Sequence, residues 1–142
     1  MVKGHACNGV AYDKELDGSF TGGTLASGNY YLTEDVSLIY NLVIAAGSDV
    51  KICLNGKNIT GQFIDNDGTL TLSNCDTAKG SISGYWGESS SVLNGNAVID
   101  SDDYSQVKDT SKINGCTFNT DVRCRNSSEI SDGTFKDRKS VV

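Results

Sequence analysis

The stretch ICLNGKNITG, from Ile52 to Gly61, decides the fold. Two short apolar runs flank the pair Asn55-Gly56, and this pattern is the strongest short-range signal for a β-hairpin. The same pair also suits the corner of a coil that continues in one direction, because asparagine and glycine adopt the left-handed backbone conformation at low cost. The rest of the sequence has to distinguish a hairpin from a coil.

A short repeat favours the coil. A β-branched segment followed by a corner recurs along the chain, as Ile59–Gly61, Ile82–Gly84, Val98–Asp100, Ile113–Gly115 and Ile130–Asp132. The clearest pair is INGCTF and ISDGTF, in which Phe118 matches Phe135. Stacked coils require such repetition, because each coil buries its apolar face only against its neighbours. The sequence therefore predicts an all-β fold, a single-stranded right-handed parallel β-helix of about five or six coils.

The repeat also predicts the division of the chain. Residues 1–28 lack it and are expected to form an irregular N-terminal lead-in that caps the coils, while residues 29–142 form the parallel β-helix. Asn94-Gly95 and Asn114-Gly115 predict two further corners. Alternation within the short strands predicts which side chains point inward. They are Ile52, Leu54, Ile59, Leu70, Leu72, Ile82, Val98, Ile113, Phe118, Val122, Ile130 and Phe135.

Length and charge exclude several classes of protein. A chain of 142 residues corresponds to one domain, and its net charge of −6 argues against nucleic acid as a partner. No apolar run approaches the ~20 residues that a membrane-spanning helix needs. The N-terminus has no apolar segment typical of a signal peptide, so we expect either a cytoplasmic protein or a chain without its leader.

The five cysteines are Cys7, Cys53, Cys75, Cys116 and Cys124. No C-x-x-C motif occurs, and the chain's single histidine forms a His/Cys cluster with Cys7 alone, so we expect no metal and no cofactor. Cys53 should lie on the outer face, since Ile52 and Leu54 point inward, and Cys75 follows about one coil later. These two are expected to be neighbours, as stacked thiols or as a disulfide, with Cys116 and Cys124 as a second candidate pair.

Several segments resemble a known family. They are SGNYYLTEDVSL (27–38), ICLNGKNITG (52–61), GTLTLSNC (68–75), KGSISG (79–84) and ISDGTF (130–135). Together they resemble the right-handed parallel β-helix modules of surface and secreted proteins of gut Firmicutes, whose fold is similar to that of the pectate-lyase-like superfamily. The resemblance covers about residues 27–135. Lys57 stands where histidine is usual, and Asp132 stands where the first glycine of a G-G-T-F repeat is usual.

The resemblance implies a secreted or cell-surface location. It also implies glycans or host surface polymers as partners, and neighbouring modules of a longer chain. The superfamily includes polysaccharide enzymes as well as non-catalytic stalks and adhesins, so the fold alone does not decide the function.

Two groups of residues are candidate sites. Tyr85 and Trp86 form a glycine-bounded aromatic pair that could stack on a sugar ring, or Trp86 could cover the edge of a coil. The densest group of carboxylates could serve polysaccharide cleavage, with outward arginines one coil later as the basic groups, or it could be a solvated loop. This alternative groove consists of Asp100, Asp102, Asp103, Arg123 and Arg125.

These features predict a non-catalytic structural or adhesion module of a bacterial surface or secreted protein, with weak carbohydrate binding at Tyr85 and Trp86. The alternative is a fragment of a polysaccharide lyase or glycoside hydrolase of the pectate-lyase-like superfamily. An ice-binding β-helix ranks third, because only Thr69 and Thr71 offer an outward threonine pair.

Overall fold

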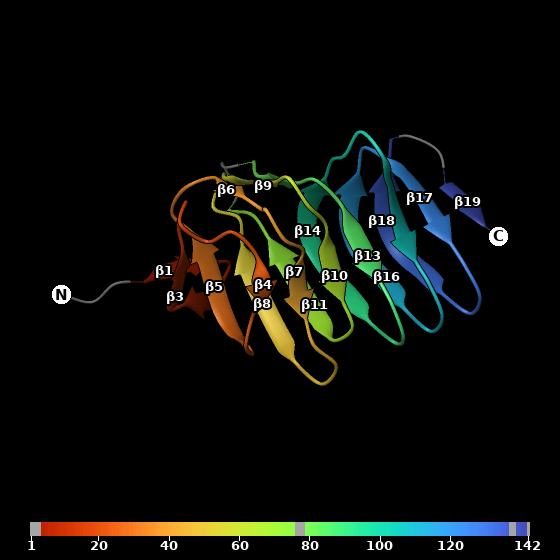
Figure 1. The fold of residues 1–142 in the computed structure, drawn as a ribbon, viewed down its shortest axis with the longest axis horizontal. Helices are drawn as coiled ribbons and strands as arrows, with labels where there is room; N and C mark the ends of the chain where they lie inside the picture. Colours follow the sequence, from red (N-terminus) through yellow and green to blue (C-terminus); the bar gives the residue numbers. More distant parts are fainter. Residues whose placement is uncertain (1–3, 76–78, 137–138, 142) are drawn as a thin grey trace.

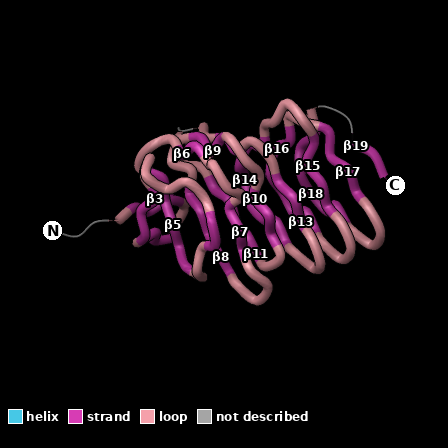
Figure 2. The backbone as a smooth tube through the Cα atoms, in the orientation of Figure 1, coloured by secondary structure: helices cyan, strands magenta, loops and turns pink. Residues whose placement is uncertain are grey.

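The computed structural model describes residues 4–75 and 79–136 and the backbone of residues 139–141. The described chain contains no helix and forms a parallel β-solenoid of about six turns. Successive coils lie side by side, and the two termini lie at opposite ends of the stack (Figures 1 and 2). The predicted fold class is confirmed.

One wall of the solenoid is a seven-stranded parallel sheet to which each coil contributes one short strand. Its strands are β4 (Gly23–Thr24), β7 (Leu42–Ile44), β10 (Ile64–Asn66), β13 (Tyr85–Gly87), β15 (Tyr104–Val107), β17 (Asp121–Cys124) and β19 (Lys139–Val141).

The remaining walls belong to a second sheet, also parallel. Early coils contribute two separate strands to it, whereas later coils contribute one long strand that runs along both walls. The first row is β3 (Lys14–Leu16), β5 (Gly28–Leu32), β8 (Asp49–Cys53) and β11 (Thr69–Ser73), and the second row is β6 (Val36–Ser37), β9 (Asn58–Thr60) and β12 (Ser81–Ile82). The long strands are β14 (Val92–Ile99), β16 (Lys112–Phe118) and β18 (Glu129–Phe135).

Asn55-Gly56 is a corner of the coil. Its φ angles are 52° and 77°, both left-handed, as predicted. The flanking strands β8 and β9 find parallel partners in neighbouring coils, β8 in β5 and β11 and β9 in β6 and β12. The hairpin interpretation of this stretch is thereby excluded.

An antiparallel hairpin does occur near the N-terminus. Strands β1 (His5–Cys7) and β2 (Val10–Tyr12) pair around Asn8-Gly9, whose φ angles are 53° and 79°. Among the strands of the described residues, only those of this hairpin stand outside the coils, because β3 and β4 already pair in parallel with β5 and β7. The solenoid therefore begins within the stretch 1–28 that the sequence predicts as an irregular lead-in.

Apolar side chains stack in columns that run through the coils. One column aligns Ile59, Ile82, Ile99, Phe118 and Phe135, and its last two rings stack with centroids 5.3 Å apart. A second column aligns Val50, Leu70, Leu93, Ile113 and Ile130. The repeated isoleucine triplets thus belong to two columns, whereas the sequence predicts one repeating phase.

A β-bulge shows that two predictions are wrong: the inward position of Val98, and the corners at Asn94-Gly95 and Asn114-Gly115. Gly95 lies inside β14 with φ of 135°, and the pairing with β16 shifts between Gly95 and Val98. The shift turns Ala97 and Ile99 inward and leaves Val98 only partly buried. Asn94-Gly95 and the matching Asn114-Gly115 are therefore irregularities inside long strands and not corners. The other predicted inward residues are buried, except Ile130 and Phe135, which are partly buried and pack against the core.

Candidate functional site

Aromatic side chains form a continuous stack along the outer side of the seven-stranded sheet. Phe63, next to β10, lies 5.2 Å from the ring of Trp86 on β13, measured between centroids. The Trp86 ring lies 6.1 Å from that of Tyr104 on β15. The Arg123 guanidinium on β17 lies 3.6 Å above the Tyr104 ring, at cation–π distance. Four successive strands of this sheet, β10 to β17, are linked in this way.

Trp86 is held between neighbouring coils. It has one aromatic partner from the coil before it and one from the coil after it, and its Nε1 atom is buried with no hydrogen-bond partner among the described residues. Gly84 permits this arrangement, because a Cβ atom there would lie 2.2 Å from the Phe63 ring. The geometry favours the interpretation in which Trp86 covers the coil edges.

Tyr85 lies in the core. Its side chain is fully buried, and its hydroxyl accepts a 3.1 Å hydrogen bond from the Asn66 amide, which also donates to the backbone oxygen of Val92. Asn66 Oδ1 accepts from the backbone N–H of Gly68, so this buried amide is satisfied at both ends. Burial raises the pKa of Tyr85 to about 12. Tyr85 does not reach the surface, so it cannot provide the predicted sugar contact.

The three aspartates of the alternative groove are exposed and line one surface hollow of about 510 Å³. Phe63, Ser81 and Ser83 complete part of its wall, and the Asp103 backbone N–H donates to the Ser101 hydroxyl at 3.2 Å. The structure therefore brings Asp100, Asp102 and Asp103 together.

The two arginines do not join this hollow. Arg123 is stacked on Tyr104, and Arg125, the residue after β17, is exposed. Neither lines the hollow that the aspartates form. The basic groups of the predicted groove thus lie outside the hollow that its carboxylates line.

A second hollow, of about 610 Å³, is lined in part by four asparagines: Asn58, Asn74, Asn96 and Asn119. The amides of Asn58 and Asn74 form hydrogen bonds within the solenoid. Asn74 Nδ2 donates to the Gly80 carbonyl and Asn74 Oδ1 accepts from the Gly80 N–H, while Asn58 Oδ1 accepts from both the N–H and the hydroxyl of Ser81. Asn74 and Asn119 directly follow strands β11 and β16, whereas Asn58 begins β9 and Asn96 lies within β14, so no single sequence signal marks the four positions.

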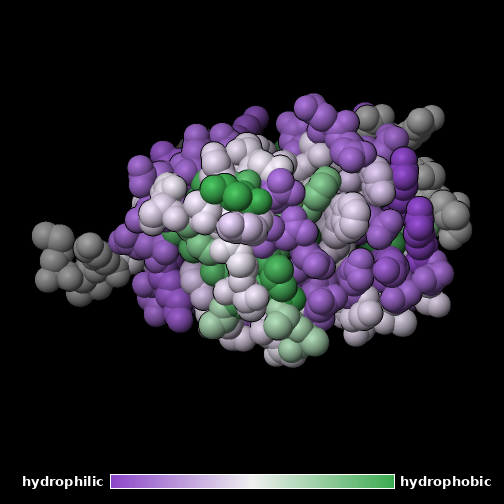
Figure 3. Space-filling model, in the orientation of Figure 1, coloured by the Kyte–Doolittle hydropathy of each residue, from purple (hydrophilic) through white to green (hydrophobic). Residues whose placement is uncertain are grey.

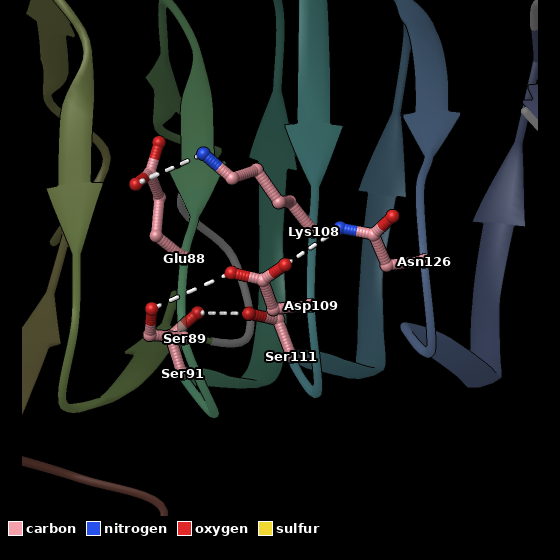
Figure 4. A network of polar contacts seen from close by, with 7 residues as sticks. All are labelled: Glu88, Ser89, Ser91, Lys108, Asp109, Ser111 and Asn126. Carbon is pink, nitrogen blue, oxygen red and sulfur yellow. Dashed lines mark hydrogen bonds and ion pairs between the residues drawn. The ribbon is translucent and has the colours of Figure 1, made fainter.

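Polar side chains also form a ladder across the turns between the two sheets (Figure 4). Inside, the Ser91 hydroxyl donates to that of Ser111 at 2.8 Å, and both residues are fully buried. Outside, Asn126 Nδ2 donates to Asp109 Oδ1 at 2.6 Å, and Lys108 pairs with Glu88 at 3.4 Å. The ladder joins like positions of successive coils, so its polar groups contribute to stacking.

The described surface shows few large apolar side chains. Ile39 and Tyr40, in the loop before β7, are the large hydrophobic residues that stand out, with 64% and 67% of their surface exposed. The face visible in Figure 3 is mainly hydrophilic, and hydrophobic side chains show only in small areas.

The N-terminal hairpin brings four sulfur and nitrogen ligands together. His5 Nε2 lies 3.0 Å from Cys75 Sγ and 3.4 Å from Cys53 Sγ, and the two sulfurs are 3.8 Å apart. With Cys7 Sγ included, all four ligand atoms lie within 4.8 Å of one another. The expected neighbourhood of Cys53 and Cys75 is confirmed. The expectation of no metal site rested on His5 and Cys7 alone, whereas the fold supplies the two distant cysteines.

The second cysteine pair lies elsewhere. Cys116 and Cys124 are buried within the main apolar core, and burial raises the pKa of the Cys116 thiol to about 12. All five cysteines are thiols in the structure, so neither predicted disulfide is formed there.

The fold places the chain in the class of parallel β-solenoids. No protein-family model matches it, and comparison with curated proteins and with solved structures gave no match. Among the residues that the structure describes, no helix has the length and apolar character needed to cross a membrane.

Proposed function

We propose that this chain is a non-catalytic structural module of a secreted or cell-surface protein. The observation that carries the proposal is the stack of Phe63, Trp86, Tyr104 and Arg123, in which outward side chains of the seven-stranded sheet connect neighbouring coils. The location rests on the sequence resemblance to surface and secreted modules.

The architecture supports a structural role. In a solenoid each repeat contacts its neighbours only, so the stack extends in one dimension and serves as a spacer or a platform. The polar ladder at the turns and the aromatic stack on the sheet both strengthen contacts between adjacent coils. The predicted sugar contact is not part of the proposal, because Tyr85 is buried and Trp86 has an aromatic partner from the coil on either side.

The enzymatic alternative has weaker support. Cleavage of a polysaccharide requires an acid and a base held on opposite sides of one bond. The aspartates share a hollow, but Arg123, one of the two predicted basic groups, is stacked on Tyr104. A lyase that used Arg123 as its base would have to release it from Tyr104, so hydrolysis by two of the aspartates is the form of the enzymatic alternative that the glycan test addresses.

A glycan panel tests the proposal. The intact chain is incubated with neutral and acidic plant and mucin glycans, with and without calcium, and both binding and the release of reducing or unsaturated ends are measured. We expect no release. The matched variants are Asp102→Ala in the hollow and Asp13→Ala, an equally exposed aspartate near the N-terminal hairpin.

Turnover that disappears in Asp102→Ala and persists in Asp13→Ala would overturn the proposal in favour of the enzyme. Binding without turnover that is lost in a folded Trp86→Ala variant would instead assign the module to carbohydrate recognition.

A further inference from the structure

We propose that His5, Cys7, Cys53 and Cys75 bind one zinc ion in a structural site that fastens the N-terminal hairpin to the solenoid. The inference is independent of the proposed function, because it rests on a different group of residues. The same four side chains come from one hairpin and two successive coils, at sequence positions up to seventy residues apart.

The distances between ligand atoms fit a tetrahedral zinc site. With Zn–S bonds of ~2.3 Å and Zn–N bonds of ~2.0–2.1 Å, tetrahedral geometry places two sulfurs ~3.8 Å apart and a sulfur ~3.5 Å from a nitrogen. The structure has 3.8 Å between the sulfurs of Cys53 and Cys75, and His5 Nε2 lies 3.4 Å from the Cys53 sulfur and 3.0 Å from the Cys75 sulfur. These three atoms are already close to tetrahedral spacing, and Cys7 Sγ, within 4.8 Å of each of them, would have to move by at most about 1 Å to complete the site.

The register of the second sheet, together with the hairpin that covers it, explains why these residues meet. Cys53 is the last residue of β8, aligned with Tyr31 before it and Ser73 after it, and Cys75 follows Ser73 by two positions. Cys53 therefore faces outward, as the alternation predicts, yet it is fully buried because the hairpin covers it.

Hydrogen bonds already hold the hairpin in place over this face. The Asp13 N–H donates to the Asn29 carbonyl at 3.2 Å, and Asn29 Nδ2 donates to the Ala11 carbonyl at 2.9 Å. Two aromatic rings flank the imidazole of His5, with centroid distances of 5.5 Å to Tyr31 and 6.0 Å to Tyr12. The ligand atoms are thus pre-positioned by packing around them.

The chemistry of the ligands selects the metal. Three sulfurs and one imidazole nitrogen suit zinc, whereas magnesium and calcium prefer oxygen ligands. Four protein ligands close the coordination sphere, which is typical of structural sites, since catalytic zinc keeps a position for water or substrate. On binding, the three thiols release their protons to solvent and His5 binds as neutral imidazole through Nε2.

The hairpin gains most from such a site. Each of its strands has three residues, and a two-stranded hairpin of this size is marginally stable by itself. A metal bound by both strand β1 and the coil ends would link the hairpin to the stack. A disulfide between Cys53 and Cys75 would link only the coils, and it would remove two of the four ligands.

Metal titration of the full chain tests the proposal. The chain is reduced, freed of metal by a chelator and titrated with Zn²⁺, and with Co²⁺ to follow the thiolate and ligand-field absorption of a tetrahedral site. We expect one equivalent of zinc with a dissociation constant below about 100 nM, a higher melting temperature with zinc, and no such effect with calcium. Zinc should protect Cys7, Cys53 and Cys75 from alkylation.

Variants of the hairpin ligands distinguish a loss of zinc binding from a loss of folding. His5→Ala and Cys7→Ser change only the hairpin, so the solenoid should still fold while zinc affinity falls at least about 100-fold. Cys124→Ala, in the main core, serves as the control and should retain the affinity of the wild type. Failure of the reduced chain to bind stoichiometric zinc, or unchanged affinity in Cys7→Ser, would overturn the proposal. So would a Cys53–Cys75 disulfide that persists under mild reduction.

Discussion

At the scale of single residues, the solenoid depends on close approach between backbones of neighbouring coils. A Cβ atom on Gly95 would lie 1.6 Å from the backbone oxygen of Leu72, and φ at Gly95 is 135°. We expect Gly95→Ala to lower the free energy of unfolding by about 3 kcal/mol or more, measured by urea denaturation.

Gly23→Ala is the matched control for this prediction. Gly23 also has a positive φ, of 103°, but a Cβ atom there meets nothing within 4 Å. Gly23→Ala should lower the free energy of unfolding by about 1 kcal/mol, from backbone strain alone. Equal losses at both glycines would contradict the close stacking of β11 and β14.

The buried hydroxyl of Tyr85 and the buried thiol of Cys116 make the free energy of unfolding decrease at alkaline pH. Burial raises the pKa of Tyr85 from 10.0, and that of Cys116 from 9.0, to about 12 in both cases. The unfolded chain releases these protons at lower pH than the folded chain, so stability present below pH 9 is lost as the pH rises towards 12. The Tyr85 contribution is about 3 kcal/mol.

Denaturation of Tyr85→Phe at several pH values measures this contribution. The variant should lose less stability than the wild type between pH 10 and pH 12, because phenylalanine has no proton to release. Parallel losses in the two proteins would show that Tyr85 is accessible to solvent in the folded state.

At the scale of elements, the bulge in β14 determines which side chains are buried. Ile99 points into the core and Val98 lies on the outer side, partly buried. We expect Ile99→Ala to cost about 2–5 kcal/mol of unfolding free energy, and Val98→Ala about 1 kcal/mol or less. The opposite order would restore the uninterrupted alternation that the sequence predicts.

Sequence patterns predict most of these elements, but they miss two features for physical reasons. Alternation assigns Ile52, Leu54 and Leu70 correctly, whereas at Val98 one bulge reverses the parity of the strand. The same dipeptide, Asn-Gly, makes a hairpin at Asn8 and a corner at Asn55, because the outcome depends on which partner strands the flanking residues find.

At the scale of the whole molecule, repetition predicts the architecture while the sites depend on three-dimensional stacking. The repeat of isoleucine triplets suffices for a solenoid, since only stacked coils require it. The meeting of His5, Cys7, Cys53 and Cys75 follows from the register of two coils and a folded-back hairpin, and no local motif specifies that register. The stack at Trp86 likewise joins residues from four coils.

A double-mutant cycle on Trp86 and Tyr104 tests the central claim, that the side chains of the aromatic stack connect neighbouring coils. The free energy of unfolding is measured for the wild type, Trp86→Ala, Tyr104→Ala and the double variant, with Tyr40→Ala as the exposed aromatic control. We predict a coupling energy of about 0.5–1.5 kcal/mol between Trp86 and Tyr104, and none between Trp86 and Tyr40. Absence of coupling, together with a glycan that binds the wild type and not Trp86→Ala, would contradict the account.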